Sequence, residues 1–441
     1  MRFLLLGRDL RQSRKRGLIR RQVTASAAAA AILGSTGVFG ALALAPSAVA
    51  GPWDGVTGWE TAKVQRIVDG DTLIVTDEVT GAPSRIRLLG VNAPEIDTAE
   101  HGGRCGGWQA KDALKALLPV GTRVRLASVG RSSLGKNARP QRVVLGWNPQ
   151  TQDFDFDVAW AMAERGWGLW FTVAREAAMS SLYRQVIAGA QQREDGMWNP
   201  ALCGTLEQSD ARVDLRITRG MAGAAPNDEW VTVRNTGSVA VDLSGWQLRD
   251  SGSQGWFTFP AGTSLAPGDY RVVRTGPGAA GSPDPHDLYV GFPRQLYQDV
   301  GTGPNLVGDG AYLLDRYGNF RFWREYPCLT YCAPEHQIAI QDLSLGRKKG
   351  AKRAATQWVR LVNQGPATTC LDGYRLSTGA LDYRVGSNTC LAPGATWTLH
   401  GGQGAADASN AYWGRTQPAL WNSGSIRLVD DLGRVAAPRS W

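Results

Sequence analysis

Histidine is scarce in this chain of 441 residues, which holds only four, at positions 101, 286, 336 and 400. The sequence shows no clustered set of His and Cys residues that would complete a zinc site. The sequence therefore argues against a mechanism built on several histidines. Carboxylates and arginines remain as candidates for chemistry, and hard carboxylate oxygens suit Ca²⁺.

Long apolar runs are absent beyond residue 50, so no later stretch is predicted to span a membrane. Residues 1–50 hold eight basic residues and one acid, followed by an uncharged Ala-rich run that ends at Ala48-Val49-Ala50. This pattern predicts a signal peptide, a mature chain that begins near Gly51, and a secreted or extracellular protein. The alternative is that residues 1–50 stay on the chain as an uncleaved membrane anchor. Most of the net charge of +9 lies in this segment, and only +2 remains on the rest.

Cysteine is sparse but even in number, with six residues. In an exported chain this predicts disulfide bonds. Six cysteines allow many pairings, and their positions along the chain guide the choice. The expected pairs are Cys105–Cys203, Cys328–Cys332 and Cys370–Cys390.

Residues 60–204 mix strand and helix patterns. The predicted strands lie in AKVQRIVDGDTLIVTDE, SRIRLLGVNAPE, RVRLASVG and QRVVLGWN. The predicted helices are GWQAKDALKALLPV, DVAWAMAERG and REAAMSSLYRQVIAGAQQRED. Asp157 is placed to cap the second helix, and Gly166 lies just past its end. Strands with helices inserted and appended favour an α+β unit built as a small barrel.

Beyond residue 206 the chain carries an internal repeat of short strands and Gly/Pro/Asn turns. Residues 229–248, EWVTVRNTGSVAVDLSGWQL, match residues 357–376, QWVRLVNQGPATTCLDGYRL. Trp230, Asn235 and Gly245 recur 128 positions later as Trp358, Asn363 and Gly373. Further matching blocks follow in the same order. The repeat predicts a duplicated domain, each copy a β-sandwich.

The stretch IVDGDTLIV, residues 67–75, sets Asp69 and Asp71 on either side of Gly70. D-G is a hairpin signal, and a glycine inside a strand also marks a bulge or a close approach of the backbone. We expect the chain to bend at Gly70 and bring a carboxylate to a site. Arg87 lies in an apolar strand, where a buried guanidinium needs an anion. That anion is either one of these aspartates or a phosphate.

Residues 123–142 contain six basic residues and no acid. They are Arg123, Arg125, Arg131, Lys136, Arg139 and Arg142. A solvated loop is one interpretation, and an electrostatic footprint for a polyanion is the other. A second basic loop, GRKKGAKR at residues 346–353, could bind nucleic acid or an anionic cell-envelope polymer.

VDGDTLIV, RIRLLGVNAPE, DVAWAMAERG and a closing helix that ends in DGMW resemble the staphylococcal-type thermonuclease family over about residues 60–200. The resemblance implies a five-stranded OB-fold barrel with three helices, and Ca²⁺-dependent hydrolysis of DNA and RNA. It implies that Arg87 and a second arginine bind the scissile phosphate, and that Glu95 activates water. It also implies that Asp71 binds calcium while Asp69 acts through water. The second arginine is expected at Arg142, with Arg139 as the alternative.

This chain departs from the family pattern at three places. The second calcium-binding acid is Asn92 here, whose amide oxygen can bind Ca²⁺ without contributing charge, so weaker binding is expected. The next residue in the family contributes a backbone carbonyl to the calcium; here it is Ala93, which can supply the same carbonyl. The turn before the second arginine lacks its usual Asp and Tyr. The aromatic pair that stacks the substrate base is missing, and Trp167, Trp170 and Phe171 lie at shifted positions nearby.

The repeated blocks WVTVRNTG, AVDLSGWQLRD, FTFPAGTSLAPGDYRVV and LLDRYGN resemble the lamin-tail domain, an immunoglobulin-like sandwich. The fold class expected is therefore α+β followed by all-β. The predicted order is a signal peptide (1–50), the thermonuclease-like domain (51–205) and two lamin-tail domains (206–330 and 336–441). The expected function is a secreted Ca²⁺-dependent nuclease acting on DNA or RNA. The alternative is a catalytically inactive extracellular protein that binds nucleic acid or the cell envelope.

Overall fold

The structure is a computed structural model. It describes residues 56, 58–96, 105–128, 140–171, 180–218, 225–252, 256–278, 284–297, 308–327, 336–346, 349 and 351–441. The predicted signal peptide and the predicted pair Cys328–Cys332 lie outside these residues. Among the helices described, none is both long and apolar enough to cross a membrane.

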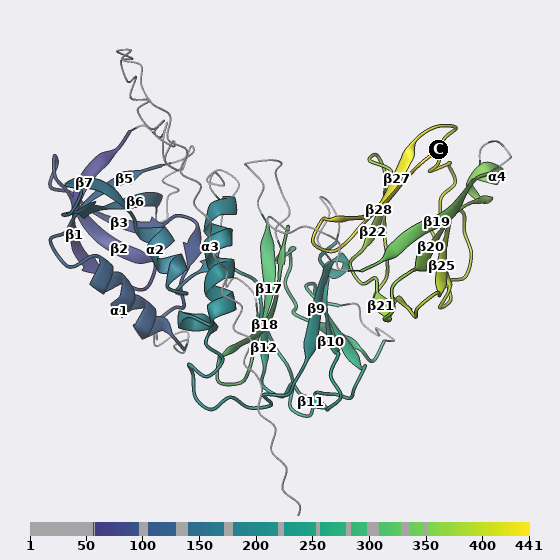
Figure 1. The fold of residues 1–441 in the computed structure, drawn as a ribbon, viewed down its shortest axis with the longest axis horizontal. Helices are drawn as coiled ribbons and strands as arrows, with labels where there is room; N and C mark the ends of the chain where they lie inside the picture. Colours follow the sequence, from purple (N-terminus) through teal and green to yellow (C-terminus); the bar gives the residue numbers. More distant parts are fainter. Residues whose placement is uncertain are drawn as a thin grey trace, which may run out of the picture. The chain divides into compact units, whose positions relative to one another are not determined.

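Five strands close into a barrel (Figure 1). β1 (Glu60–Ile67) pairs with β2 (Thr72–Asp77) and with β5 (Arg123–Ala127). β3 (Pro83–Leu88) and β6 (Gln141–Asn148) complete the ring through a parallel pairing. β7 (Asp153–Asp157) extends the sheet from β6, and the short strands β4 (Val91–Asn92) and β8 (Leu169–Trp170) pair with each other. The predicted five-stranded barrel is confirmed.

Three helices pack on the barrel, in the three segments predicted to be helical. They are α1 (Gly107–Leu117), α2 (Val158–Glu164) and α3 (Ser180–Arg193). Asp157 caps α2 as predicted, because its carboxylate accepts the Trp160 N–H at 3.0 Å. The helices bury Leu114, Met162 and Ile187 in one core with the apolar side chains of the strands. The first residues of the predicted third helix fall outside the described part of the chain.

Two β-sandwiches follow the barrel. The sheets of the first sandwich have the orders β16-β15-β10-β9 and β13-β12-β17-β18. Its strands are β9 (Val213–Thr218), β10 (Trp230–Asn235), β11 (Val241–Asp242), β12 (Gln247–Arg249), β13 (Trp256–Thr258), β14 (Ser264–Leu265), β15 (Tyr270–Arg274), β16 (Asp287–Tyr289), β17 (Asp309–Leu314) and β18 (Phe320–Tyr326).

The second sandwich repeats this topology. Its sheets have the orders β19-β20-β25-β26 and β23-β22-β27-β28. Its elements are β19 (Ile338–Leu345), α4 (Ala351–Ala354), β20 (Gln357–Asn363), β21 (Thr369–Cys370), β22 (Arg375–Ser377), β23 (Asp382–Arg384), β24 (Cys390–Leu391), β25 (Thr396–His400), β26 (Asn410–Tyr412), β27 (Ser425–Val429) and β28 (Val435–Ser440). The mixture of an α+β barrel and all-β sandwiches is the predicted fold class.

One asparagine explains part of the repeat. Asn235 Nδ2 donates to the carbonyls of Val239 at 2.7 Å and Leu265 at 2.9 Å, and its Oδ1 accepts the Gly237 N–H at 2.9 Å. Asn363 makes the same three bonds in the second copy, at 2.7, 2.8 and 2.9 Å. Both side chains are fully buried. An apolar residue would leave these backbone groups unpaired, so both copies need asparagine.

The barrel and the first sandwich share a buried core. Trp198, which ends the short helix η2 (Gly196–Trp198) after α3, is only 1% exposed. Its ring centroid lies 5.0 Å from that of Trp323 and 5.3 Å from that of Phe320, both on β18. Tyr312 on β17 joins the same cluster as the barrel side chains. The two domains are therefore packed together by aromatic contacts.

Two of the three predicted disulfides are confirmed. Cys105–Cys203 links the segment before α1 to the segment after η2, over a sequence separation of 98. The Cys203 N–H also donates to Asn319 Oδ1 of the first sandwich at 2.8 Å. Cys370–Cys390 joins β21 to β24 within the second sandwich.

Candidate active site

The stretch around Gly70 forms a hairpin turn between β1 and β2, one of the two interpretations that the D-G signal offered, and the chain bends there as expected. The N–H groups of Val68 and Asp69 both donate to the Thr72 carbonyl, at 2.8 and 3.3 Å. A Cβ added at Gly70 would lie 2.6 Å from the Ala93 Cβ and 2.7 Å from a side-chain atom of α1. Glycine is therefore required by space, since it lets the turn pack against the end of β4 and against α1.

Asp71 lies at the centre of the site and is 2% exposed. Its Oδ1 accepts the Thr72 hydroxyl at 2.9 Å, and its Oδ2 accepts the Ala93 N–H at 2.9 Å. Arg87 Nη2 lies 3.0 Å from the same Oδ2. This nitrogen also donates to Asn92 Oδ1. Arg87 therefore joins a buried carboxylate to a buried amide, and the ion pair considered for this arginine is present.

Asp69 is a buried carboxyl with a raised pKa. Its Oδ1 accepts the Asp71 N–H at 3.1 Å, and the side chain is almost fully buried. Burial first, then the charge of Asp71 and, more weakly, that of Glu95 raise the pKa of Asp69 to about 6. The Asp71 N–H partly offsets this rise. The charges of Asp71 and Glu95 thus both act on Asp69, while Asp71 pairs with Arg87.

Arg142 lies on the strand next to Arg87 but on the opposite face of the sheet. The β3–β6 pairing sets Arg87 opposite Gln141 and Leu88 opposite Arg142. Paired side chains share a face, and Leu88 points into the barrel core. Arg142 Nη1 donates to the Gln141 carbonyl at 2.9 Å. The alternative for the second phosphate arginine, Arg139, lies outside the described residues.

Comparison with known families identifies the two sandwiches. The Lamin Tail Domain family matches residues 208–327 and 333–441, which together make up more than half of the chain. The chain belongs to the lamin tail domain family. The barrel lies outside both matched segments, and a comparison with curated proteins finds no match to the chain.

The first lamin-tail domain contacts the cluster in the barrel. Asn92 Nδ2 donates to the main-chain carbonyl of Ser251, immediately after β12 and Asp250, at 2.7 Å. The two residues are 159 positions apart, so sequence reasoning missed the contact. The only signal that could have drawn attention to it is the amide at position 92, where the resemblance leads one to expect an acid.

The three aromatic residues predicted near the site, Trp167, Trp170 and Phe171, have different surroundings. Phe171 is the one that reaches Arg87, whose Cζ lies 5.4 Å from the centre of its ring. Trp170 is buried, and the guanidinium of Arg184 lies 4.7 Å from its ring centroid. Trp167 is partly buried against the barrel core. Phe171 therefore covers the arginine that the resemblance assigns to phosphate.

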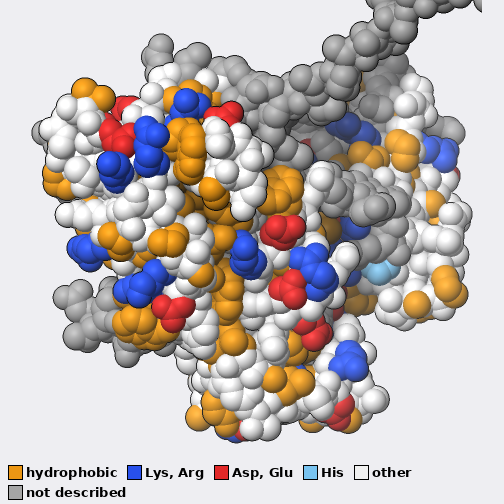
Figure 2. Space-filling view, turned by 60° about the vertical axis from the view of Figure 1, so that its left-hand side comes forward, with side chains coloured by type: hydrophobic (Ala, Val, Ile, Leu, Met, Phe, Trp, Pro, Cys, Tyr) orange, Lys and Arg blue, Asp and Glu red, His pale blue; other side chains and the backbone are white. Residues whose placement is uncertain are grey.

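The described part of the basic stretch has acidic neighbours from other strands. Arg123 pairs with Glu78 at 2.9 Å, and Arg125 lies 4.0 Å from Asp153. Both guanidinium groups lie near the ring of Phe154. Figure 2 likewise shows Lys and Arg side chains next to Asp and Glu side chains on the face in view. The remaining residues of this prediction, Arg131, Lys136 and Arg139, lie outside the described part of the chain.

The oxygen donors near Arg87 suit a hard cation. They are the Asp71 carboxylate and the Asn92 amide oxygen, both in contact with Arg87, and Asp69 accepts the Asp71 N–H. Oxygen ligands of this kind fit Ca²⁺. Asp71 and Asn92 also accept hydrogen bonds from Arg87. The donor set therefore fits Ca²⁺ in kind, although it shares two of its oxygens with a guanidinium.

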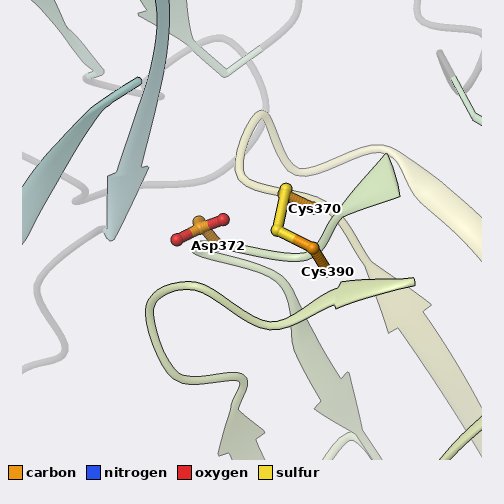
Figure 3. Close-up of side chains that lie close together, drawn as sticks. All are labelled: Cys370, Asp372 and Cys390. Atoms are coloured by element: carbon orange, nitrogen blue, oxygen red, sulfur yellow. A yellow bond between two sulfur atoms is a disulfide. The ribbon is translucent and has the colours of Figure 1, made fainter. Parts of the chain in front are cut away.

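A second place where possible metal ligands converge is in the second lamin-tail domain. Cys370, Asp372 and Cys390 bring their ligand atoms within 4.8 Å of one another (Figure 3). The two sulfurs form a disulfide, so neither is a thiolate. Asp372 instead accepts the Asn388 N–H at 2.6 Å and the Thr232 hydroxyl at 3.2 Å. This group holds the two lamin-tail domains together and offers no metal site.

Proposed function

We propose that this protein is a secreted, Ca²⁺-dependent phosphodiesterase that cleaves DNA or RNA in its N-terminal barrel. The observation that carries the proposal is the environment of Arg87. Its guanidinium pairs with the Asp71 carboxylate, which in turn neighbours Asp69, and its Nε is buried without a hydrogen-bond partner among the described residues. A buried donor of this kind favours an acceptor, and a phosphate oxygen would supply one.

The residues of the cluster have distinct roles in this proposal. Arg87 binds the scissile phosphate and neutralises the charge that develops on it. Glu95 orients or deprotonates the attacking water, and Asp69 assists through water. Asp71 and the Ala93 carbonyl are the first candidates to hold the metal, which when bound polarises a phosphoryl oxygen. The sequence also suggested Arg142 for the phosphate, but its side chain lies on the opposite face of the sheet from Arg87, so this proposal gives the phosphate to Arg87.

Access to the site sets one condition. The Phe171 ring covers the Arg87 guanidinium, whose side chain is 11% exposed. A phosphate that binds Arg87 would therefore lie close to this ring. Phe171 follows β8 directly at the edge of the described residues, and residues 172–179 lie outside them.

A second candidate function has an observation in its favour. Asp71 and Asn92 already bind the Nη2 group of Arg87, and Asn92 contributes no charge to a metal. A protein that binds nucleic acid or the cell envelope without cleaving it would keep this arrangement as a structural ion pair. The basic loop of the second lamin-tail domain belongs with this alternative. In its described part, Arg353 Nε donates to the Leu345 carbonyl at 2.9 Å.

Cleavage of single-stranded DNA by the disulfide-bonded mature chain separates the two functions. We expect cleavage with Ca²⁺ and none with a chelator. Glu95→Gln should lower the rate at least about 100-fold while DNA binding persists. Arg87→Ala should abolish cleavage, and Arg85→Ala, two residues earlier on the same face and exposed, should not. A folded wild-type chain that binds DNA but leaves it intact at millimolar Ca²⁺ would refute the nuclease.

A further inference from the structure

Asn92 uses both halves of its amide, and each half serves a different domain. Its Oδ1 accepts from Arg87 within the barrel, and its Nδ2 donates to the Ser251 carbonyl of the first lamin-tail domain. The side chain is 2% exposed, so water does not compete for these bonds. An aspartate could accept from Arg87 but would set a negative oxygen against the Ser251 carbonyl.

Ser251 is itself fixed inside the lamin-tail domain. Its N–H and its hydroxyl both donate to Asp309 Oδ1, at 3.0 and 2.6 Å. The same oxygen accepts the Gly310 N–H at 2.8 Å at the start of β17. Ser251 and Asp309 are each 3% exposed. The carbonyl that faces Asn92 therefore belongs to a rigid, hydrogen-bonded corner of the sandwich.

The two domains meet through more than this one bond. Arg184 on α3 donates to the Pro327 carbonyl and lies 3.6 Å from Glu325. Gln191 lies two turns further along the same face of α3 and donates to Glu325 at 3.0 Å. With the aromatic cluster around Trp198, these contacts hold the sandwich against the barrel. Ser251 is thus held in place relative to Asn92.

We propose that Asn92 is a positioning residue that aligns Arg87 and takes its own orientation from Ser251, so that the first lamin-tail domain forms one wall of the active site. This inference rests on the proposed function and assigns the lamin-tail domain a part in it. The chain of contacts runs from Asp309 through Ser251 and Asn92 to Arg87 and ends at Asp71. Asn92 is then a fixed donor–acceptor pair and not a weakened calcium ligand.

Asn92→Asp distinguishes this role from metal binding. If Asn92 is a ligand that lacks a charge, the new carboxylate should lower the Ca²⁺ concentration needed for half-maximal cleavage and should keep or raise kcat. If Asn92 positions Arg87, the carboxylate repels the Ser251 carbonyl and loses one bond. We then expect kcat to fall at least about tenfold with no gain in Ca²⁺ response. The opposite result would overturn the inference.

A substitution in the lamin-tail domain tests the same path from its other end. Asp309→Ala removes the acceptor that holds Ser251, and we expect kcat to fall about tenfold. Asp309→Asn keeps an oxygen for the same donors and should restore most of the rate. Asn235→Ala removes buried hydrogen bonds elsewhere in the same domain and should leave kcat near that of the wild type. Equal rates for Asp309→Ala and the wild type would contradict the proposal.

Failure of the nuclease and failure of this inference can be told apart. A wild-type chain that binds DNA without cleaving it refutes the proposed function alone. The affinity for a single-stranded oligonucleotide then tests the positioning role of Asn92, because Arg87 would still bind the phosphates of the oligonucleotide. Weaker binding by Asp309→Ala than by Asp309→Asn and Asn235→Ala would support the positioning role. Equal binding by all three variants would overturn it.

Discussion

Gly70→Ala tests whether the hairpin turn places the acidic cluster. The added methyl would lie 2.6 and 2.7 Å from two methyl groups, one on Ala93 and one on Ala110. Ordinary contacts between carbon atoms lie near 3.5–4.0 Å, so the turn must move by roughly 1 Å. Overpacking of this kind costs about 1–3 kcal/mol. A shift of about 1 Å at Asp69 and Asp71 should also lower cleavage by roughly 100-fold.

The assay is thermal unfolding together with cleavage of single-stranded DNA. Gly386→Ala is the matched control, because a Cβ there meets nothing within 4 Å. Adding Ala93→Gly to Gly70→Ala removes one of the two clashes and should recover part of the lost stability. A Gly70→Ala protein with the melting temperature and activity of the Gly386→Ala protein would refute this account of the turn.

Three further outcomes follow from the structure. Burial first, and Asp250 second, raise the pKa of Asp309 from 3.8 to about 7. The native state therefore binds a proton that the unfolded state releases, and the unfolding free energy should fall by up to about 4 kcal/mol as pH rises from 3.8 to 7. Asp309→Asn should flatten this dependence in urea titrations at several pH values, and an unchanged slope would contradict it. Replacing Cys105 and Cys203 by serine opens a link over 98 residues and should cost about 4.7 kcal/mol in chemical unfolding. A loss under about 1 kcal/mol would argue against that estimate. Asn235→Ala and Asn363→Ala each leave equivalent backbone groups unpaired and should destabilise their own domains by similar amounts, about 3 kcal/mol, in domain-resolved hydrogen exchange. Unequal losses would show that the two copies use the asparagine differently.

The barrel strands were predictable because their apolar residues alternate and their ends carry turn residues. Val64, Leu73, Ile86 and Val144 occupy core positions on four of these strands. β7 was missed, because its sequence DFDFD alternates aromatics with acids and precedes the Asp157 helix cap too closely to stand out. For IVDGDTLIV, the hairpin turn and the expected bend coincide, since the turn itself presents Asp71 to Arg87.

Long-range features of the site were beyond a reading of the sequence. The face on which Arg142 lies depends on the register with which β6 meets β3, and that register is set only when the barrel closes. The Asn92–Ser251 bond depends on how two domains pack, which no local pattern encodes. Partners for Arg123 and Arg125 come from other strands for the same reason. Sequence identified the residue types, and tertiary packing chose their neighbours.

Trp198 has a consequence for how such a protein can arise. The side chain belongs to the barrel segment, yet it is shielded by Phe320 and Trp323 of the lamin-tail domain. A barrel cut from its neighbour would expose this indole and the rings around it to water. Gene rearrangements that exchange one domain for an unrelated one would therefore yield an aggregation-prone, poorly folded product. The barrel and the first lamin-tail domain are expected to be inherited as a pair, whereas the Trp198 contact places no such constraint on the second copy.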